Sequence, residues 1–94
     1  MAAYRLLYSE TSRTQIRNLH PEMKAIIRTR LNMLRRDPFA GKKLERELSG
    51  YRSLRAHRFR IIYKLKEEDG IVEIHHVGHR KDIYELFSER VPFL

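Results

Sequence analysis

The sequence predicts an α+β domain in which a helical hairpin packs on one face of a small, largely antiparallel sheet. The predicted order is β-α-α-β-β-β, and it allows a short helix after the last strand. Apolar residues recur at helical spacing between residues 21 and 37, and apolar and polar residues alternate between residues 58 and 66, with Ile62 as the one apolar residue on the polar face. A turn-forming segment, Glu67–Gly70, separates the alternating run from another apolar run. We expect residues 1–94 to form one domain, because 94 residues is an ordinary size for a single domain.

The first third of the chain predicts one strand and two helices. Ala2–Ser9 is a short aromatic and aliphatic run, which favours a strand. Thr11–Leu19 predicts a first helix with the serine at position 9 as its N-cap, and His20 ends it because a proline follows. Pro21 suits the first turn of the second helix, which runs to residue 37. That helix has one apolar stripe, made by Met23, Ile26, Ile27, Leu31 and Leu34.

The second half of the chain predicts a hairpin and a third strand. Phe39–Gly50 is predicted to be a connection with a helical turn near Leu44–Leu48. A two-residue loop at His57-Arg58 would join the strands on either side of it. The run Ile71–Val77 is apolar on both faces, which favours a central strand.

The register of the predicted hairpin follows from its apolar residues. Pairing Ala56 with Phe59 places the apolar side chains of both strands on the core side, whereas a slip of one residue would invert the faces. In this register Arg55 lies directly opposite Arg60 on the other face. Like charges in a cross-strand pair are destabilising. An anion between the two guanidinium groups would remove the repulsion, so the sequence predicts a phosphate site there.

Composition points to an anionic partner. The net charge is +8, and fourteen of the twenty basic residues are arginines, whose planar guanidinium matches phosphate. From Leu48 to Lys66 there are six basic residues and no acidic one. Nucleic acid or an acidic protein segment fits such a surface, and the alternative is a solvated basic face that serves solubility.

Other classes of protein are not favoured by the sequence. It contains no cysteine, which excludes disulfides and cysteine-ligated metal sites, and no apolar run is long enough for a membrane span. We therefore expect a soluble cytoplasmic protein without cofactor or metal. His75 and His76 are adjacent on a strand, so we expect them on opposite faces and not as a metal pair. Five aromatic side chains are predicted to be core residues: Tyr4, Tyr8, Tyr51, Phe59 and Tyr63.

Two segments, LSGYRSLRAHRFRIIYKL and VGHRKDIYELF, resemble the RelE/ParE superfamily of bacterial toxins from type II toxin–antitoxin pairs. The RelE-like members of that superfamily are metal-independent endonucleases that cleave mRNA on the ribosome. The ParE-like members instead inhibit DNA gyrase. The short helical hairpin and the ending GHRKDIY favour the RelE-like group. The resemblance implies a cognate antitoxin as partner, mRNA on the ribosome as substrate, and neither a membrane nor a small-molecule cofactor. A plain nucleic-acid-binding module is a third hypothesis.

The resemblance also implies site residues. Arg60 matches the arginine of the superfamily's catalytic strand, Arg80 matches the arginine after the Gly-x pair, and Tyr84 matches the C-terminal tyrosine, which orients the hydroxyl or stacks on a base. Arg55 completes the predicted catalytic set. The predicted RNA-binding residues are Arg52, His57, Arg58, His79 and Lys81.

The general base is less clear from the sequence, because Arg52 and Arg55 stand where the best-known member of the superfamily has lysines. Arginine is a poor base, since its pKa lies above about 12. Catalysis by charge alone is the favoured hypothesis. The alternative is that His57 or His79 takes the proton.

Overall fold

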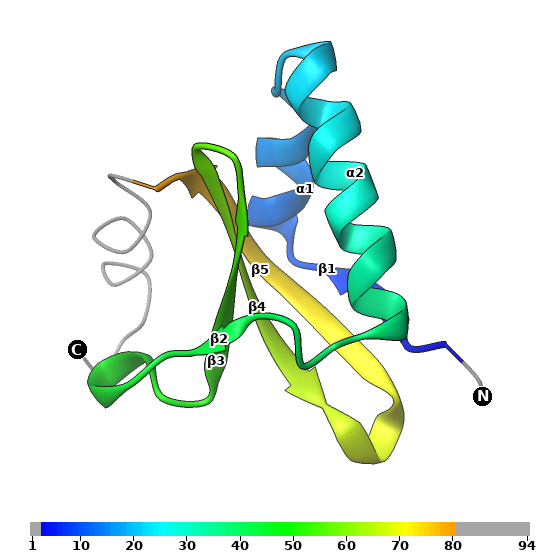
Figure 1. The fold of residues 1–94 in the computed structure, drawn as a ribbon, viewed down its shortest axis with the longest axis vertical. Coiled ribbons are helices and arrows are strands. Elements are labelled where there is room, and N and C mark those ends of the chain that lie inside the picture. The colour runs from blue at the N-terminus through cyan, green and yellow to red at the C-terminus, as the bar shows by residue number, and fades with distance from the viewer. Residues whose placement is uncertain (1–2, 81–94) are drawn as a thin grey trace.

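The computed structural model describes residues 3–80 and arranges its strands in one sheet of order β1-β5-β4-β3-β2 (Figure 1). The strands are β1 (Arg5–Tyr8), β2 (Lys42–Lys43), β3 (Tyr51–Ala56), β4 (Phe59–Lys66) and β5 (Ile71–His79). The helices are α1 (Glu10–Arg17) and α2 (Pro21–Arg36), and two short 3-10 turns cover Arg46–Leu48 and Glu67–Asp69. β1 runs parallel to β5, and the other pairings are antiparallel. The predicted α+β class is confirmed, and the short helix predicted after the last strand concerns residues outside the described range.

Both helices begin at the capping residues that local chemistry favours. The Ser9 side chain accepts a hydrogen bond from the Ser12 backbone N–H at 3.0 Å, which satisfies one open donor at the start of α1. Pro21 is the first residue of α2, where its missing N–H costs nothing. The predicted cap and helix boundary are therefore confirmed.

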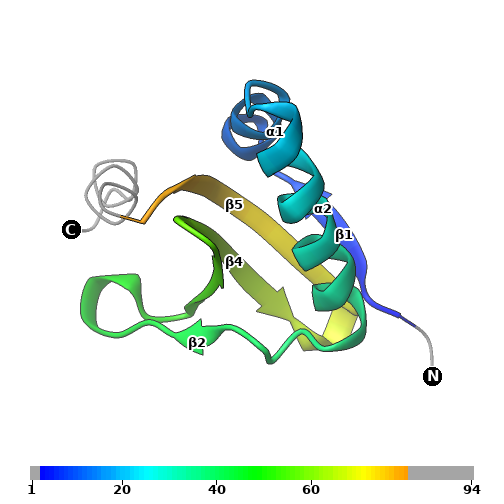
Figure 2. The ribbon, with the colours of Figure 1, turned by 45° about the horizontal axis from the view of Figure 1, so that its top comes forward.

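The two helices cover one face of the sheet (Figures 1 and 2). Ile27, Leu31 and Leu34 of α2 are buried against apolar side chains of three neighbouring strands. The strand residues of this core are Leu54, Ala56, Ile61, Tyr63, Val72, Ile74 and Val77. The stripe predicted for α2 is thus its buried side, and it also includes Met33, which packs on the core.

Tyr63 fixes the connection after α2 to the sheet. Its side chain is fully buried, and its hydroxyl donates to the Pro38 carbonyl at 2.7 Å and accepts from the Gly41 N–H at 2.9 Å. Burial raises the pKa of this phenol above its usual value, against the smaller opposite effect of the Gly41 hydrogen bond. The neutral phenol therefore holds the chain in place where it leaves α2 for β2.

Four features of the sheet differ from the predictions. The sequence did not indicate β2, and β5 continues to His79 instead of ending at Val77. Tyr8, predicted to be a core residue, is 36% exposed because it lies on the edge strand. Tyr51 packs with Ile62 in a separate apolar cluster away from the main core.

A bulge in β5 overturns the expectation for the two adjacent histidines. Ile62 pairs with His76 while Tyr63 pairs with Ile74, so His75 is an extra residue without its own partner in the ladder. In a β-bulge two residues on one strand oppose one on the other, and the usual alternation of side chains is lost. His75 contacts Tyr51, and His76 is opposite Ile62 in the register, so both lie on the Ile62 side of the sheet. The His76 ring also contacts α1, with 2.9 Å between its Nε2 and Gln15 Nε2.

Candidate active site

The predicted hairpin register is confirmed. Ala56 pairs with Phe59, Leu54 with Ile61, and Arg55 with Arg60. The loop contains no glycine, and His57 takes the left-handed conformation, with φ 56°, that a tight two-residue turn requires. Apolar matching across β3 and β4 fixes this register even though the loop lacks the usual turn residues.

Arg55 and Arg60 lie opposite each other on the far face, the sheet face turned away from α1 and α2. Arg55 is exposed and donates a hydrogen bond to the His57 backbone carbonyl, at 3.3 Å. Both ion pairs found among residues 3–80 involve Glu73, and neither includes one of these arginines. The two guanidinium groups thus form an uncompensated cationic pair within the described part of the chain.

Two more arginines reach the same end of the sheet. Arg58 lies in the β3–β4 turn, and its backbone carbonyl accepts a hydrogen bond from the Arg80 N–H at 2.7 Å. This bond ties the end of β5 to the turn. Arg60 pairs with Gly78, which has no side chain to fill the space beside it. We call these four residues, Arg55, Arg58, Arg60 and Arg80, the arginine cluster.

Arg52 takes a different position from the arginine cluster. It is on β3, but its guanidinium donates to the Gly41 carbonyl at 2.9 Å and to the Phe39 carbonyl at 3.4 Å. The same group lies 5.2 Å from the centre of the Phe39 ring, a cation–π distance. The structure therefore shows Arg52 bound to the α2–β2 connection.

The two histidines predicted to contact RNA lie toward the helices. His57 lines a pocket of about 270 Å³ together with Ile26, Arg30 and Met33 of α2. His79 pairs with Phe59, and its ring packs edge-on against that ring at 5.9 Å. Phe59 packs on the main core, so this pair is on the helix side of the sheet. Neither imidazole is on the far face with Arg60.

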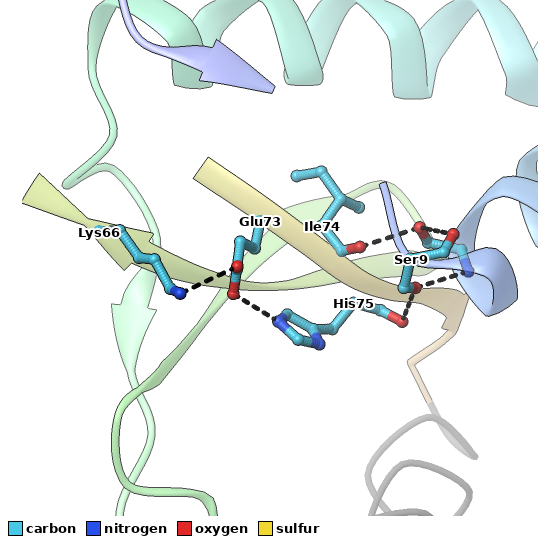
Figure 3. Close-up of polar contacts among 6 residues, drawn as sticks. Ser9, Lys66, Glu73, Ile74 and His75 are labelled. Atoms are coloured by element: carbon cyan, nitrogen blue, oxygen red, sulfur yellow. Dashed lines mark hydrogen bonds and ion pairs between the residues drawn. The ribbon is translucent and has the colours of Figure 1, made fainter. Parts of the chain in front are cut away.

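A polar cluster that sequence reasoning missed occupies the other end of the far face (Figure 3). The Glu73 carboxylate lies 3.2 Å from His75 Nε2 and 3.3 Å from Lys66 Nζ. Partial burial opposes the ionisation of Glu73, yet the hydrogen bonds and charges of His75 and Lys66 lower its pKa. The sequence could have indicated this cluster, because Glu73 and His75 stand at alternate positions of one strand, where side chains share a face.

The last predictions concern two C-terminal residues, a metal site and a membrane span. Lys81 and Tyr84 lie outside the described residues. Within residues 3–80 no group of three or more histidine, aspartate or glutamate side chains could hold a metal ion. In the same range no helix is long and apolar enough to cross a membrane.

Comparisons with known proteins fit the resemblance stated from the sequence. Residues 6–84 match the family model described as the ParE toxin of type II toxin–antitoxin system, parDE. Toxin RelG of Mycobacterium tuberculosis is 35% identical over 83 residues, which are 86% of this chain and 95% of RelG.

Solved structures agree with these sequence matches. The crystal structure of the toxin–antitoxin complex RelBE2 from M. tuberculosis gives a TM-score of 0.76 at 32% identity, covering 83% of this chain and 99% of that chain. A variant of the E. coli toxin RelE in the free state gives 0.75 at 21% identity, covering 98% of this chain and 99% of that chain, and shows the common fold alone. The chain therefore belongs to the ParE toxin family of type II toxin–antitoxin systems, within the RelE/ParE superfamily.

Proposed function

We propose that this toxin is an endoribonuclease that cleaves mRNA on the ribosome in the cytoplasm and so inhibits translation. The observation that carries the proposal is the direct opposition of Arg55 and Arg60 with no acidic partner among residues 3–80. A sheet selected for stability alone does not gain from two opposed cations. A scissile phosphate between them turns the repulsion into two favourable contacts.

The reaction class follows from what the arginine cluster supplies. RNA carries its own nucleophile, because the ribose 2′-hydroxyl can attack the adjacent phosphate without metal. The transition state concentrates negative charge on the phosphate oxygens, and fixed guanidinium groups stabilise such charge. Arg60 and Arg80 act as clamps in this proposal, with Arg55 opposite and Tyr84 and Lys81 as the contributions of the C-terminal segment. Arg58 contacts the neighbouring backbone, which positions RNA without specifying its sequence.

Arg52, His57 and His79 have secondary roles in the proposal. Arg52 supports the strand that carries Arg55, because its guanidinium is bound by the α2–β2 connection. His57 and His79 border the arginine cluster in sequence, and we assign them contacts to RNA at its edge. Their positions toward the helices speak against a role as the base.

The proposed partner is a cognate antitoxin. Related solved structures are toxin–antitoxin complexes, among them RelBE2 of M. tuberculosis and the intact RelBE of E. coli. An acidic, amphipathic segment that folds on contact would complement the cationic far face and cover the arginine cluster.

Inhibition of DNA gyrase is the second candidate function. It is favoured by the matching family model, whose description names the ParE toxin. A gyrase inhibitor would need the basic surface for a protein or DNA partner and would cleave no RNA.

Expression of the toxin in cells, followed by mapping of mRNA 5′ ends, separates the two functions. We expect new 5′ ends within coding sequences shortly after induction, together with an arrest of protein synthesis. Unchanged mRNA ends combined with double-strand breaks in DNA would contradict the endonuclease proposal and support inhibition of DNA gyrase.

A further inference from the structure

The short strand β2 adds a lysine to the far face. Lys42 pairs with Ser53, and Lys43 pairs with Arg52. Side chains that are directly opposite each other in an antiparallel pair lie on the same face of the sheet. Ser53 is two positions from Arg55 on β3, so Lys42 shares the far face with both. Lys43 shares the opposite face with Arg52.

The packing of Leu44 supports this placement of Lys42. The Leu44 N–H donates to the Tyr51 carbonyl at 2.9 Å, which continues the β2–β3 pairing beyond Lys43. The Leu44 side chain packs with Ile62 in the apolar cluster that is separate from the main core. Ile62 is two positions from Arg60 on β4, so this cluster lies on the far face. Lys42 is two positions from Leu44 and therefore lies on that face as well.

Lys42 stands beside the opposed arginines. Its pairing with Ser53 makes Arg55 its diagonal neighbour, at a separation of about 7–8 Å that long side chains can bridge. Arg55 in turn pairs with Arg60, and β3 lies between β2 and β4 in the sheet. Three cations thus follow one another across three adjacent strands of the far face: Arg60, Arg55 and Lys42.

Two other lysines of the far face are engaged by neighbouring side chains. Lys66 Nζ lies 3.3 Å from the Glu73 carboxylate (Figure 3), and Lys64 Nζ lies 5.5 Å from the centre of the Tyr51 ring. Lys42 is exposed, and neither ion pair of the described residues 3–80 includes it. Of these three lysines, Lys42 is therefore the one whose charge is best placed for an anionic ligand.

We propose that Lys42 binds a second phosphate of the RNA strand, one nucleotide away from the scissile phosphate. This inference rests on the proposed endonuclease function and gives that site a further subsite. Arg55 and Arg60 flank the scissile phosphate, so a cation displaced from them by one strand meets a neighbouring linkage of the same RNA. The lysine ammonium is a compact charge on a flexible stem, which suits contact with a single phosphate oxygen.

Lys42 is a positioning residue in this arrangement, because it touches no reacting atom. A contact to a non-scissile phosphate is equally strong before and during the reaction, so it strengthens binding and leaves the chemical step unchanged. It also carries no information about the base sequence. Its effect is to hold the RNA in register over the arginine cluster.

Single-turnover cleavage of a defined mRNA, with toxin in excess over programmed ribosomes, tests the assignment. Lys42→Gln should raise the half-saturating toxin concentration about two- to tenfold, the worth of one hydrogen bond, and leave the plateau rate close to wild type. Lys42→Arg should restore the wild-type value. Lys43→Gln is the matched control, because it removes the same charge from the next residue of β2 on the other face.

Neutral linkages in the mRNA identify the phosphate. A methylphosphonate group replaces one phosphate at a time on either side of the mapped cleavage site. For the wild type and for Lys43→Gln, neutralising the linkage next to the scissile one on one side should raise the half-saturating concentration. In Lys42→Gln the same linkage should have no further effect, since a contact that is already lost cannot be lost twice.

The outcomes distinguish this inference from the function on which it rests. A wild type that cleaves no RNA on ribosomes overturns the endonuclease and its second phosphate site together. A wild type that cleaves, with equal half-saturating concentrations for Lys42→Gln and Lys43→Gln, overturns the role of Lys42 alone. The assignment is also overturned if every neutral linkage weakens Lys42→Gln as much as it weakens the wild type, because Lys42 would then contact something other than the mRNA.

Discussion

At the scale of single residues, the geometry separates side chains that the sequence groups together. Arg52, Arg55 and Arg58 follow one another within seven positions, yet only the last two lie at the arginine cluster. The Arg52 guanidinium donates hydrogen bonds to the Phe39 and Gly41 carbonyls. Charge density along a sequence thus predicts a basic surface, while strand parity decides which of its residues lie on the far face.

The arginine cluster carries the clearest residue-scale prediction. Arg60→Ala and Arg80→Ala should each abolish growth inhibition in cells, because removing one charged transition-state donor costs about 10²–10³ in rate. Growth of cells expressing each variant at matched protein levels is the measurement. Arg28→Ala, on the exposed side of α2, is the control and should remain toxic.

The fold of these variants has to be checked in the same experiment. Arg60 forms no ion pair among residues 3–80, so its removal should leave the urea unfolding midpoint close to wild type. Variants that are folded and still fully toxic would show that the site lies elsewhere.

At the scale of elements, the connection between α2 and β2 depends on one close approach. A Cβ at Gly41 would lie 2.5 Å from the Tyr63 hydroxyl oxygen and 2.9 Å from Tyr63 Cζ. Gly41→Ala should therefore lower the free energy of unfolding by about 1–3 kcal/mol, the usual cost of overpacking. Urea unfolding followed by circular dichroism measures the change.

Gly70→Ala serves as the comparison for this substitution. Gly70 has φ 64° and no atom within 4 Å of a built Cβ, so its cost is only that of the left-handed backbone, about 1 kcal/mol. An equal or smaller loss at Gly41 would mean that Tyr63 moves aside at little cost.

The sequence could predict those elements that are formed by interactions between residues close together in the chain. The hairpin register, the cap of α1, the start of α2 at Pro21 and the stripe of α2 depend on residues close in sequence, and these predictions were right. The pairing of Lys42–Lys43 with β3 was missed because two lysines carry no apolar signal. The β5 bulge was missed because a run that is apolar on both faces hides a shift of one residue.

The candidate site was likewise predictable only where it depends on residues close in sequence. Matching apolar residues across one hairpin was enough to place Arg55 opposite Arg60. The position of His75 depends on the bulge and on contacts with Tyr51 from a strand two places away in the sheet. No local pattern encodes that contact, so the sequence did not indicate the Glu73–His75 pair.

At the scale of the whole molecule, charge should govern how the toxin meets its antitoxin. Binding of an acidic segment to the far face should weaken as salt rises, because exposed charges are screened beyond about 8–10 Å at ordinary ionic strength. Apolar contacts should preserve part of the affinity at high salt. The dissociation constant measured over a series of salt concentrations should show both contributions.

The double variant Arg55→Ala/Arg60→Ala identifies the surface responsible. It should bind the antitoxin more weakly at low salt and should show a shallower salt dependence than Arg28→Ala. A salt dependence identical in both variants would contradict direct coverage of the arginine cluster by the antitoxin.

The place of β5 in the sheet has a consequence for how the toxin is made. β5 lies between β1 and β4, although it is the last strand in chain order among the described residues. Proteins leave the ribosome N-terminus first, so β1 has emerged long before the strand that must pair with it. Until then the core lacks Val72, Ile74 and Val77, and the hairpin turn lacks its hydrogen bond from Arg80. The nascent chain therefore cannot complete its sheet until β5 has been synthesised, so the order of synthesis delays assembly of the arginine cluster to the end of the described chain.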